Sequence, residues 1–235
     1  MPKRKIKQIE DSSEIESIMS NLSKTKLKLK KVEYKKKKKE LLKILFDKNT
    51  KIVFLSGPAG TSKTFMAVYA ALQLFNMDNK YSINYVRTII ESADRGMGAL
   101  PGNVDEKFCP FMLPLEDKLY ELIGVSESRK AVDNKIVSAI PINYLRGASI
   151  NDQILIADES QNFSEKELIT LITRIGKNSK RFICGDPMQS DISGKSGFNK
   201  IKNIFNDDDS VLQGIHTFEF NYKDIKRSEI LKYII

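Results

Sequence analysis

Short apolar runs separated by longer mixed segments recur along most of the chain. The runs are rich in β-branched and aromatic residues, which is typical of strands buried on both faces of a parallel sheet. They predict strands over residues 51–56, 83–87, 136–140, 153–157, 180–184 and 218–220. The segments between them carry apolar residues at helical spacing and predict helices over residues 65–75, 105–123, 164–175, 195–205 and 227–235. Strands that alternate with helices indicate an α/β fold whose mainly parallel sheet has helices on both faces.

The N-terminal part of the chain has a different pattern. Residues 1–13 are charged and polar without apolar periodicity, which predicts disorder. Over residues 14–32 the apolar positions fall near helical spacing, although lysines dilute the pattern. A run of lysines then leads into residues 41–46, which predict an amphipathic helix. We therefore expect a basic, partly disordered or helical N-terminal extension over residues 1–50 and one domain over residues 51–235.

Length and composition limit the classes of protein to consider. A chain of 235 residues with 41% hydrophobic content suits one packed domain with an appendage. It contains no apolar stretch of the length that spans a membrane and no signal-like start, so we expect neither. Its two cysteines, Cys109 and Cys184, are too few for a disulfide framework and suit a reducing cytoplasm. The simplest interpretation is that both cysteines pack in the core and that the single histidine, His216, is a structural or surface residue. Too few nitrogen and sulfur ligands remain for a structural zinc site.

The positive charge is concentrated near the N-terminus. Residues 1–51 hold 17 Lys/Arg and 7 Asp/Glu, whereas the rest of the chain holds 22 and 23, within a net charge of +9. A basic arm on a nearly neutral core favours contact with a polyanion through salt-sensitive phosphate contacts. The alternative is a solvated lysine-rich segment without a partner.

A glycine-containing loop joins the first strand of the domain to the following helix, which is the context that a Walker A phosphate loop requires. Successive backbone N–H groups and a helix N-terminus make a concave site for phosphates. We expect Lys63 to reach the β- and γ-phosphates of ATP and Thr64 to coordinate Mg²⁺. The alternative is a plain glycine turn before a helix. The loop consists of Gly57, Pro58, Ala59, Gly60, Thr61, Ser62, Lys63 and Thr64.

One loop position departs from the Walker A pattern. Glycine is expected directly before the lysine, and this chain has Ser62 there. If the position needs a positive φ, serine costs on the order of 1–2 kcal/mol. We therefore expect weakened or adjusted nucleotide binding rather than none.

Two adjacent carboxylates follow the apolar strand at residues 153–157. In a chain with a phosphate loop, this is the Walker B arrangement. Asp158 is expected to hold Mg²⁺ opposite Thr64, and Glu159 to orient and deprotonate the attacking water. On its own, such a pair is equally typical of the N-terminus of a helix.

A third polar segment follows the strand at residues 180–184. Its sequence, Gly-Asp-Pro-Met-Gln, predicts a sharp turn that places Gln189 beside the γ-phosphate position, where it would sense that phosphate. The alternative is an ordinary Gly-Asp-Pro turn.

Taken together, these elements resemble the PhoH family, helicase-like ATPases related to the superfamily 1 helicase core. The resemblance runs from about Lys51 to the C-terminus and includes segments that a generic P-loop protein lacks. They are GALPGNVDEKFCPFMLPLEDKL (98–119), INYLRGASINDQILIADESQN (142–162), LITRIGKNSKRFICGDPMQSDI (171–192) and the closing FEFNYKDIKRSEILKYII.

The resemblance implies a RecA-like core, ATP hydrolysis, a partner of single-stranded RNA or another nucleic acid, and a homo-oligomer such as a ring, for example a hexamer. It also implies that Arg227 acts as an arginine finger, for which the alternative is a solvated helix residue. Arg87, Arg146 and Arg174 lie in matching segments and are expected to contact phosphate or nucleic acid, or else to form ion pairs.

Family members often carry a glutamine before the first strand that reads adenine, whereas this chain has lysines and Glu40 there, so adenine selectivity is in doubt. The compact core would suit a bacteriophage-encoded member acting in the host cytoplasm.

The leading hypothesis is therefore a Mg²⁺-dependent ATPase coupled to nucleic acid. A second hypothesis is an ATP-gated module that binds nucleic acid or protein with little turnover, which Ser62 favours. A third, a P-loop kinase acting on a small acceptor, is disfavoured by Glu159 and by the loop that carries Gln189.

Overall fold

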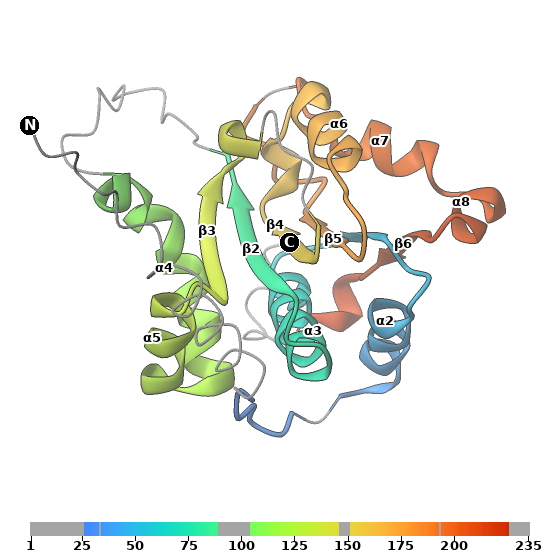
Figure 1. Ribbon diagram of the computed structural model, residues 1–235. Coiled ribbons are helices and arrows are strands. Elements are labelled where there is room, and N and C mark those ends of the chain that lie inside the picture. Colours follow the sequence, from blue (N-terminus) through green and yellow to red (C-terminus); the bar gives the residue numbers. More distant parts are fainter. Residues whose placement is uncertain (1–25, 33, 89–103, 146–150, 193, 226–235) are drawn as a thin grey trace, which may run out of the picture.

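The computed structural model describes residues 26–32, 34–88, 104–145, 151–192 and 194–225 (Figure 1). Within them the chain forms a six-stranded sheet in the order β3-β2-β4-β5-β1-β6, and every pairing is parallel. The strands are β1 (Ile52–Ser56), β2 (Ser82–Arg87), β3 (Val137–Pro141), β4 (Gln153–Ala157), β5 (Lys180–Gly185) and β6 (Ile215–Glu219).

Helix α2 precedes the first strand, and the other described helices connect the strands. The helices are α2 (Lys36–Phe46), α3 (Lys63–Met77), α4 (Val104–Ile123), α5 (Val125–Asp133), α6 (Glu165–Thr173), α7 (Phe198–Ile204) and α8 (Asp208–Leu212), with short 3₁₀ turns at η1 (Ile142–Leu145), η2 (Ser160–Asn162) and η3 (Tyr222–Asp224). The predicted α/β class is confirmed as a RecA-like P-loop fold, and each predicted strand is found within a few residues of its expected bounds. The helix expected over residues 227–235 lies outside the described residues.

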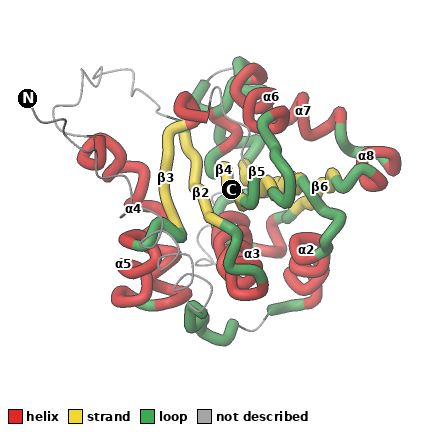
Figure 2. The backbone as a smooth tube through the Cα atoms, viewed as in Figure 1, coloured by secondary structure: helices red, strands yellow, loops and turns green. Residues whose placement is uncertain are grey.

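Helices lie beside the strands of the sheet (Figure 2). The buried side chains between sheet and helices form two cores. On β1, Val53 and Leu55 join the core beneath α2, α3 and α4, whereas Ile52 and Phe54 join the core beneath α6 and α7. All five residues of β1 are buried, which explains why this strand is a continuous apolar run in the sequence.

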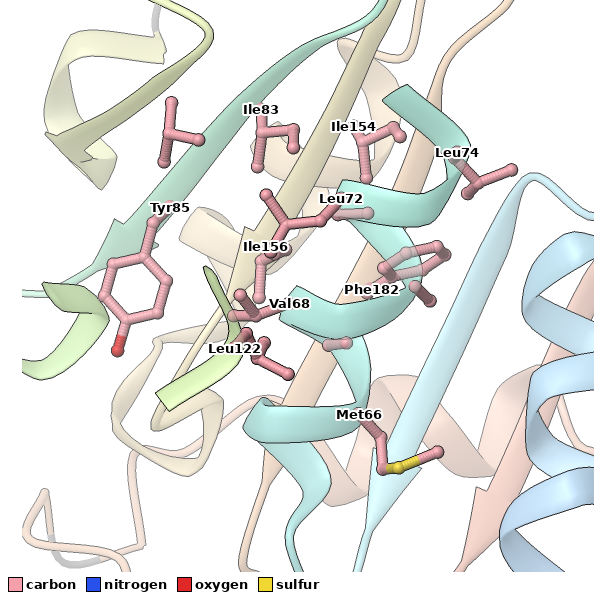
Figure 3. Close-up of a cluster of buried hydrophobic side chains, with 14 of the residues drawn as sticks. Met66, Val68, Leu72, Leu74, Ile83, Tyr85, Leu122, Ile154, Ile156 and Phe182 are labelled. Carbon is pink, nitrogen blue, oxygen red and sulfur yellow. The ribbon is translucent and has the colours of Figure 1, made fainter. Parts of the chain in front are cut away.

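Helix α3 fills the centre of the first core. Figure 3 shows Val68 and Leu72 of this helix against Ile154 and Ile156 of β4, with Phe182 of β5 beside them. The phosphate loop lies between the fully buried strand β1 and this helix, so buried elements anchor the loop at both ends. This rigid base fixes where the loop lies.

The segment before β1 packs on this core. Leu27, Leu41 and Leu45 are each at most 4% exposed and belong to the same cluster as α3. Residues 26–32 are not helical, so the helix expected over residues 14–32 is wrong for this part; residues 14–25 lie outside the described residues. The reason is tertiary, because the backbone of Leu27 exchanges two hydrogen bonds with the side chain of Asn76.

Candidate nucleotide-binding site

Three strands deliver the predicted site residues to one edge of the sheet. Because β1, β4 and β5 are parallel, the residues that follow them, Gly57, Asp158 and Asp186, meet at their carboxyl ends. Open α/β sheets bind ligands at this edge. A cleft of about 530 Å³ lies there, and its lining includes Lys63, Thr64, Asp158, Glu159 and Gln189.

The phosphate loop is closed by its own lysine. Lys63 Nζ donates to the carbonyl oxygens of Gly57 at 2.6 Å and Pro58 at 2.9 Å. Asp186 holds the loop from the neighbouring strand, because its Oδ2 accepts from the backbone N–H of Ala59 at 2.9 Å. A ligand phosphate that recruits Lys63 must replace these two carbonyl oxygens.

Gly57 is required by a close approach of two backbones. Its φ is 141°, and a Cβ placed on it would lie 2.6 Å from the carbonyl oxygen of Phe220. Phe220 in turn donates its N–H to the carbonyl of Ser56. The start of the loop is therefore locked against the segment that follows β6.

Ser62 adopts the conformation that the Walker A glycine provides. Its φ is 70° and its ψ is 29°, in the left-handed region, directly before α3. Its side chain makes no capping hydrogen bond to the helix. The conditional expectation of a positive φ is thus met, and the serine carries a steric cost that glycine would not.

Thr64 and Asp158 lie together on one side of the cleft and are the candidate metal ligands. Thr64 Oγ1 donates to Asp158 Oδ1 at 2.5 Å, while Asp158 Oδ2 accepts from the hydroxyl of Tyr85. A hydroxyl and a carboxylate opposite a phosphate loop are the oxygen donors that Mg²⁺ takes together with phosphates and water. The residues present therefore fit a magnesium ion.

Glu159 is held in an unusual backbone conformation beside the cleft. Its φ is 51°, which is uncommon for a non-glycine residue and typical of functional sites. Its Oε2 accepts from Gln161 Nε2 at 2.6 Å, and its Oε1 lies 4.0 Å from a guanidinium nitrogen of Arg87. The carboxylate is thus oriented and still 42% exposed, so water can reach it.

Gln161 is a residue that the sequence reasoning did not single out. It is 2% exposed, and its amide joins three parts of the site. Its Oε1 accepts from the N–H of Asp186, and its Nε2 donates to Glu159 and to the carbonyl oxygen of Gln189. Gln189 itself is exposed and lines the cleft. The sequence feature that could have identified Gln161 is its position two residues after Glu159, in the segment Asp-Glu-Ser-Gln.

Burial and charge act in opposite directions on Lys63. Removal from water lowers its pKa, while the carboxylates of Asp186, Glu159 and Asp158 act to raise it. Cys184 is fully buried, and burial raises the pKa of its thiol well above the usual value. The thiol is therefore a neutral packing group, and the cation of Lys63 depends on the acidic residues around it.

The amino-acid sequence matches a known protein family over most of its length. The model of the family described as PhoH-like protein matches residues 31–235. This chain belongs to the PhoH-like family. The resemblance noted from about Lys51 onward thus extends back over α2, in agreement with the packing of this helix on α3.

Individual PhoH-like relatives share about a third of their aligned residues with the chain. A PhoH-like protein of Mycobacterium tuberculosis (strain ATCC 25618 / H37Rv) is 33% identical over 191 residues, which cover 80% of this chain and 53% of that protein. One of Bacillus subtilis (strain 168) is 32% identical over 190 residues, 80% of this chain and 58% of that protein. Protein PhoH of Escherichia coli (strain K12) is 30% identical over 183 residues, 76% and 50% respectively. The chain spans about half the length of these curated relatives.

Only some of the arginines that the sequence suggests as functional residues lie in the part of this PhoH-like protein that the structure describes. Arg87 lies beside Glu159, whereas Arg174 ends α6 and is not among the residues that line the cleft. Arg146 and Arg227 lie outside the described residues. His216 is on the edge strand β6, away from the nucleotide cleft. Among the described helices, none has the length and apolar character needed to cross a membrane.

One end of the cleft is formed by the segment before β1. Val32, Tyr34 and Lys38 line it on one side, and Asp117 and Glu121 of α4 line it as well. Lys38 is 5% exposed although it belongs to the lysine run. The Tyr34 hydroxyl is buried and makes no hydrogen bond to the described residues. The lysine-rich segment thus contributes directly to the candidate site.

Proposed function

We propose that this chain binds ATP with Mg²⁺ in the cleft and hydrolyses it. The observation that carries the proposal is the meeting of Lys63, the Thr64–Asp158 pair and Glu159 on one cleft. These groups come from the end of one strand and the start of one helix, and they match the parts that phosphoryl transfer needs. A glycine turn or a helix-capping acid pair would not require their convergence.

The residues divide the chemistry between them. Lys63 gives up its carbonyl partners and binds the β- and γ-phosphate oxygens. Glu159 orients a water molecule and takes its proton as the water oxygen bonds to the γ-phosphorus. The bond from that phosphorus to the β–γ bridging oxygen breaks, which leaves ADP and inorganic phosphate. Gln161 keeps the Glu159 carboxylate facing the cleft through its 2.6 Å hydrogen bond.

Thr64 and Asp158 are the residues that would hold Mg²⁺. When bound, the ion offsets negative charge on the phosphate oxygens as the bond to the γ-phosphorus breaks. The short hydrogen bond between Thr64 and Asp158 keeps both oxygens on the same side of the cleft.

We further propose that hydrolysis is coupled to single-stranded RNA or another nucleic acid. The charge supports this, because residues 1–51 hold 17 Lys/Arg against 7 Asp/Glu. Two features of α2 support this proposal: several of its lysines are exposed to solvent, and its Lys38 is buried in the cleft wall. Lys37 of the same helix pairs with Asp224 at 2.6 Å, and its ammonium group lies 5.7 Å from the centre of the Phe220 ring. The backbone of Phe220 closely approaches Gly57. A polyanion bound to α2 would therefore act on a helix that contacts the nucleotide site.

Assembly and location are parts of the same proposal. A homo-oligomeric ring would let Arg227 of one subunit serve the cleft of the next as an arginine finger. Cytoplasmic location suits the free, buried thiol of Cys184. A bacteriophage origin stays a prediction.

An ATP-gated binding module is the second candidate. Ser62 favours it, because a strained loop residue without a compensating hydrogen bond weakens the fit to phosphates. In such a module ATP would change the affinity for nucleic acid while turnover stays slow.

Turnover of ATP, with and without single-stranded RNA, separates the two candidates. We expect Mg²⁺-dependent turnover in the wild type that RNA stimulates. Glu159→Gln should bind ATP normally but lose turnover by about 10²–10⁴-fold, the usual contribution of a general base. The matched control is Glu127→Gln on the surface of α5, which should leave turnover unchanged. A folded wild type that binds ATP and turns over no faster than Glu159→Gln would reject the ATPase in favour of the gated module.

The role of α2 in RNA binding is tested by its exposed lysines. Replacing Lys36, Lys39 and Lys43 with glutamine should weaken RNA binding. It should also make the slope of log affinity against log salt shallower, by about 0.7 for each RNA phosphate that these lysines neutralise in the wild type. The control replaces Lys130, Lys177 and Lys200, which are exposed elsewhere. An equal drop in RNA affinity in both triple variants would contradict a binding role specific to α2.

A further inference from the structure

Tyr85 combines an apolar and a polar environment. It lies in β2, it is 0% exposed, and its ring belongs to the core with Ile83, Ile156 and Phe182 (Figure 3). Its hydroxyl donates a hydrogen bond to Asp158 Oδ2. A tyrosine hydroxyl carries its proton at neutral pH, so it serves as the donor of this hydrogen bond.

Asp158 is fixed from three directions. Its Oδ1 accepts from Thr64 Oγ1 at 2.5 Å, its Oδ2 accepts from Tyr85, and its backbone N–H donates to the carbonyl of Val86 at 2.9 Å. The residue is 6% exposed. Since Tyr85 occupies one oxygen and Thr64 lies beside the other, the carboxylate cannot rotate without breaking a hydrogen bond.

The sheet register explains how Tyr85 reaches this position. Strand β2 pairs with β4, and Tyr85 is opposite Ile156, two residues before Asp158. A tyrosine is long enough to carry its hydroxyl from that register position past the end of β4. The ring is held by the core, so the position of the hydroxyl is set by packing.

We propose that Tyr85 is a positioning residue that directs one oxygen of Asp158 toward the metal ion; this inference rests on the proposed function. Its hydroxyl takes Oδ2 and leaves Oδ1, the oxygen beside Thr64, for the ion. Partners of this kind behind a metal-ligating carboxylate affect metal affinity or activity by about 10–100-fold. A purely structural role is the alternative, because a buried tyrosine hydroxyl needs some hydrogen-bond partner.

The test compares wild type with Tyr85→Phe in the full chain, a change that removes only the hydroxyl. Binding of Mn²⁺, observed by electron paramagnetic resonance with a non-hydrolysable ATP analogue, should weaken roughly 10-fold or more. Affinity for the analogue in the presence of EDTA should stay unchanged. Steady-state turnover should need more Mg²⁺ for half-saturation and should recover when Mg²⁺ is raised. The matched control is Tyr81→Phe, whose hydroxyl donates to Asn178 on the surface and should not affect Mn²⁺ binding.

Wild-type Mn²⁺ affinity in a folded Tyr85→Phe protein overturns the role of Tyr85 and leaves the proposed function standing. A wild type that binds no Mn²⁺ with the analogue overturns both. If Tyr85→Phe does not fold, the near-ultraviolet tyrosine absorption of a Tyr34→Phe protein is measured instead, because Tyr34 also lines the cleft and would otherwise contribute to the signal. Metal binding to the analogue complex should then perturb the near-ultraviolet tyrosine absorption, and an unperturbed spectrum overturns the inference.

Discussion

Lys63 and Lys180 are two lysines whose ammonium groups make nearly the same hydrogen bonds, one at the carboxyl ends of the strands and the other at their amino ends. Lys63 is half-buried, and Lys180 is buried. Lys63 Nζ donates to the carbonyls of Gly57 and Pro58, and Lys180 Nζ donates to those of Asp47 and Thr50 at 2.6 and 2.7 Å. Burial lowers the pKa of both side chains. Judged by hydrogen bonds alone, either could be a ligand-binding lysine.

Their surroundings separate them. Lys63 borders an open cleft together with Asp158, Glu159 and Asp186, so a phosphate can replace its carbonyl partners. Lys180 is 4% exposed and lies at the amino end of β5. There it donates hydrogen bonds to backbone carbonyl groups of the segment between α2 and β1. The comparison shows that a lysine removed from water marks a ligand-binding site only where an open cleft and acidic side chains lie beside it.

The largest effect should come from Lys63→Ala. Loss of the ammonium group should lower kcat/KM for ATP by about 10²–10³-fold, as for other groups that stabilise charge in the transition state. The free energy of unfolding should change little, because water in the cleft can reach the loop carbonyls. Turnover and thermal unfolding are measured beside Lys130→Ala, a surface control. Retained turnover would remove Lys63 from the mechanism.

Lys180→Ala should show the opposite pattern. It leaves the buried carbonyl of Thr50 without its donor, at a cost of about 1–3 kcal/mol in the free energy of unfolding. Turnover per folded molecule should stay at the wild-type level. Chemical denaturation measures the first quantity, with Lys200→Ala on the surface of α7 as the control. If a stably folded Lys180→Ala protein loses turnover, the assignment of a functional role to Lys63 and a purely structural role to Lys180 is wrong.

Continuous apolar strands and the spacing of the phosphate loop were predictable from the sequence, because both are local patterns. β1 and β4 are buried along their whole length, and each is a largely apolar run. β5 is also buried throughout, although its apolar part is limited to Phe182, Ile183 and Cys184. The convergence of Lys63 and Asp158 on one cleft also follows from motif order, since both come after the carboxyl ends of parallel strands.

Other parts depend on tertiary contacts that no local pattern records. Helix α5 was not predicted, because it buries only Ser128 and Ala131 and has little apolar periodicity. Helix α8 has five residues and was also missed. The contact of Asp186 with Ala59 joins positions 127 residues apart, and that of Tyr85 with Asp158 joins positions 73 apart. Both require the strand order and register, which no local pattern supplies.

A pH titration of stability sharpens the comparison for Lys180. Burial lowers its pKa to about 8, whereas the unfolded chain titrates near 10.4. Between these values the unfolded state binds more protons, so this group makes the free energy of unfolding rise with pH, by about 1–2 kcal/mol from pH 7.5 to 9.5. Lys180→Met should lack this contribution. Only the difference between the two proteins is used, because the raised pKa of Cys184 acts in the opposite direction in both. Parallel pH profiles would contradict a lowered pKa.

The smallest expected effect concerns the loop that makes Lys63 different. Ser62→Gly relieves a left-handed conformation at φ 70°, while glycine also adds freedom to the unfolded chain. The net gain should be about 0.5–1 kcal/mol in the free energy of unfolding, with somewhat tighter ATP binding. Ser126→Gly in the exposed face of α5 should instead destabilise by a similar amount, because glycine is a poor helix former. If both substitutions destabilise the protein equally, Ser62 is not strained. The serine would then carry no steric cost, and the loop would bind phosphate as well as one with glycine at this position.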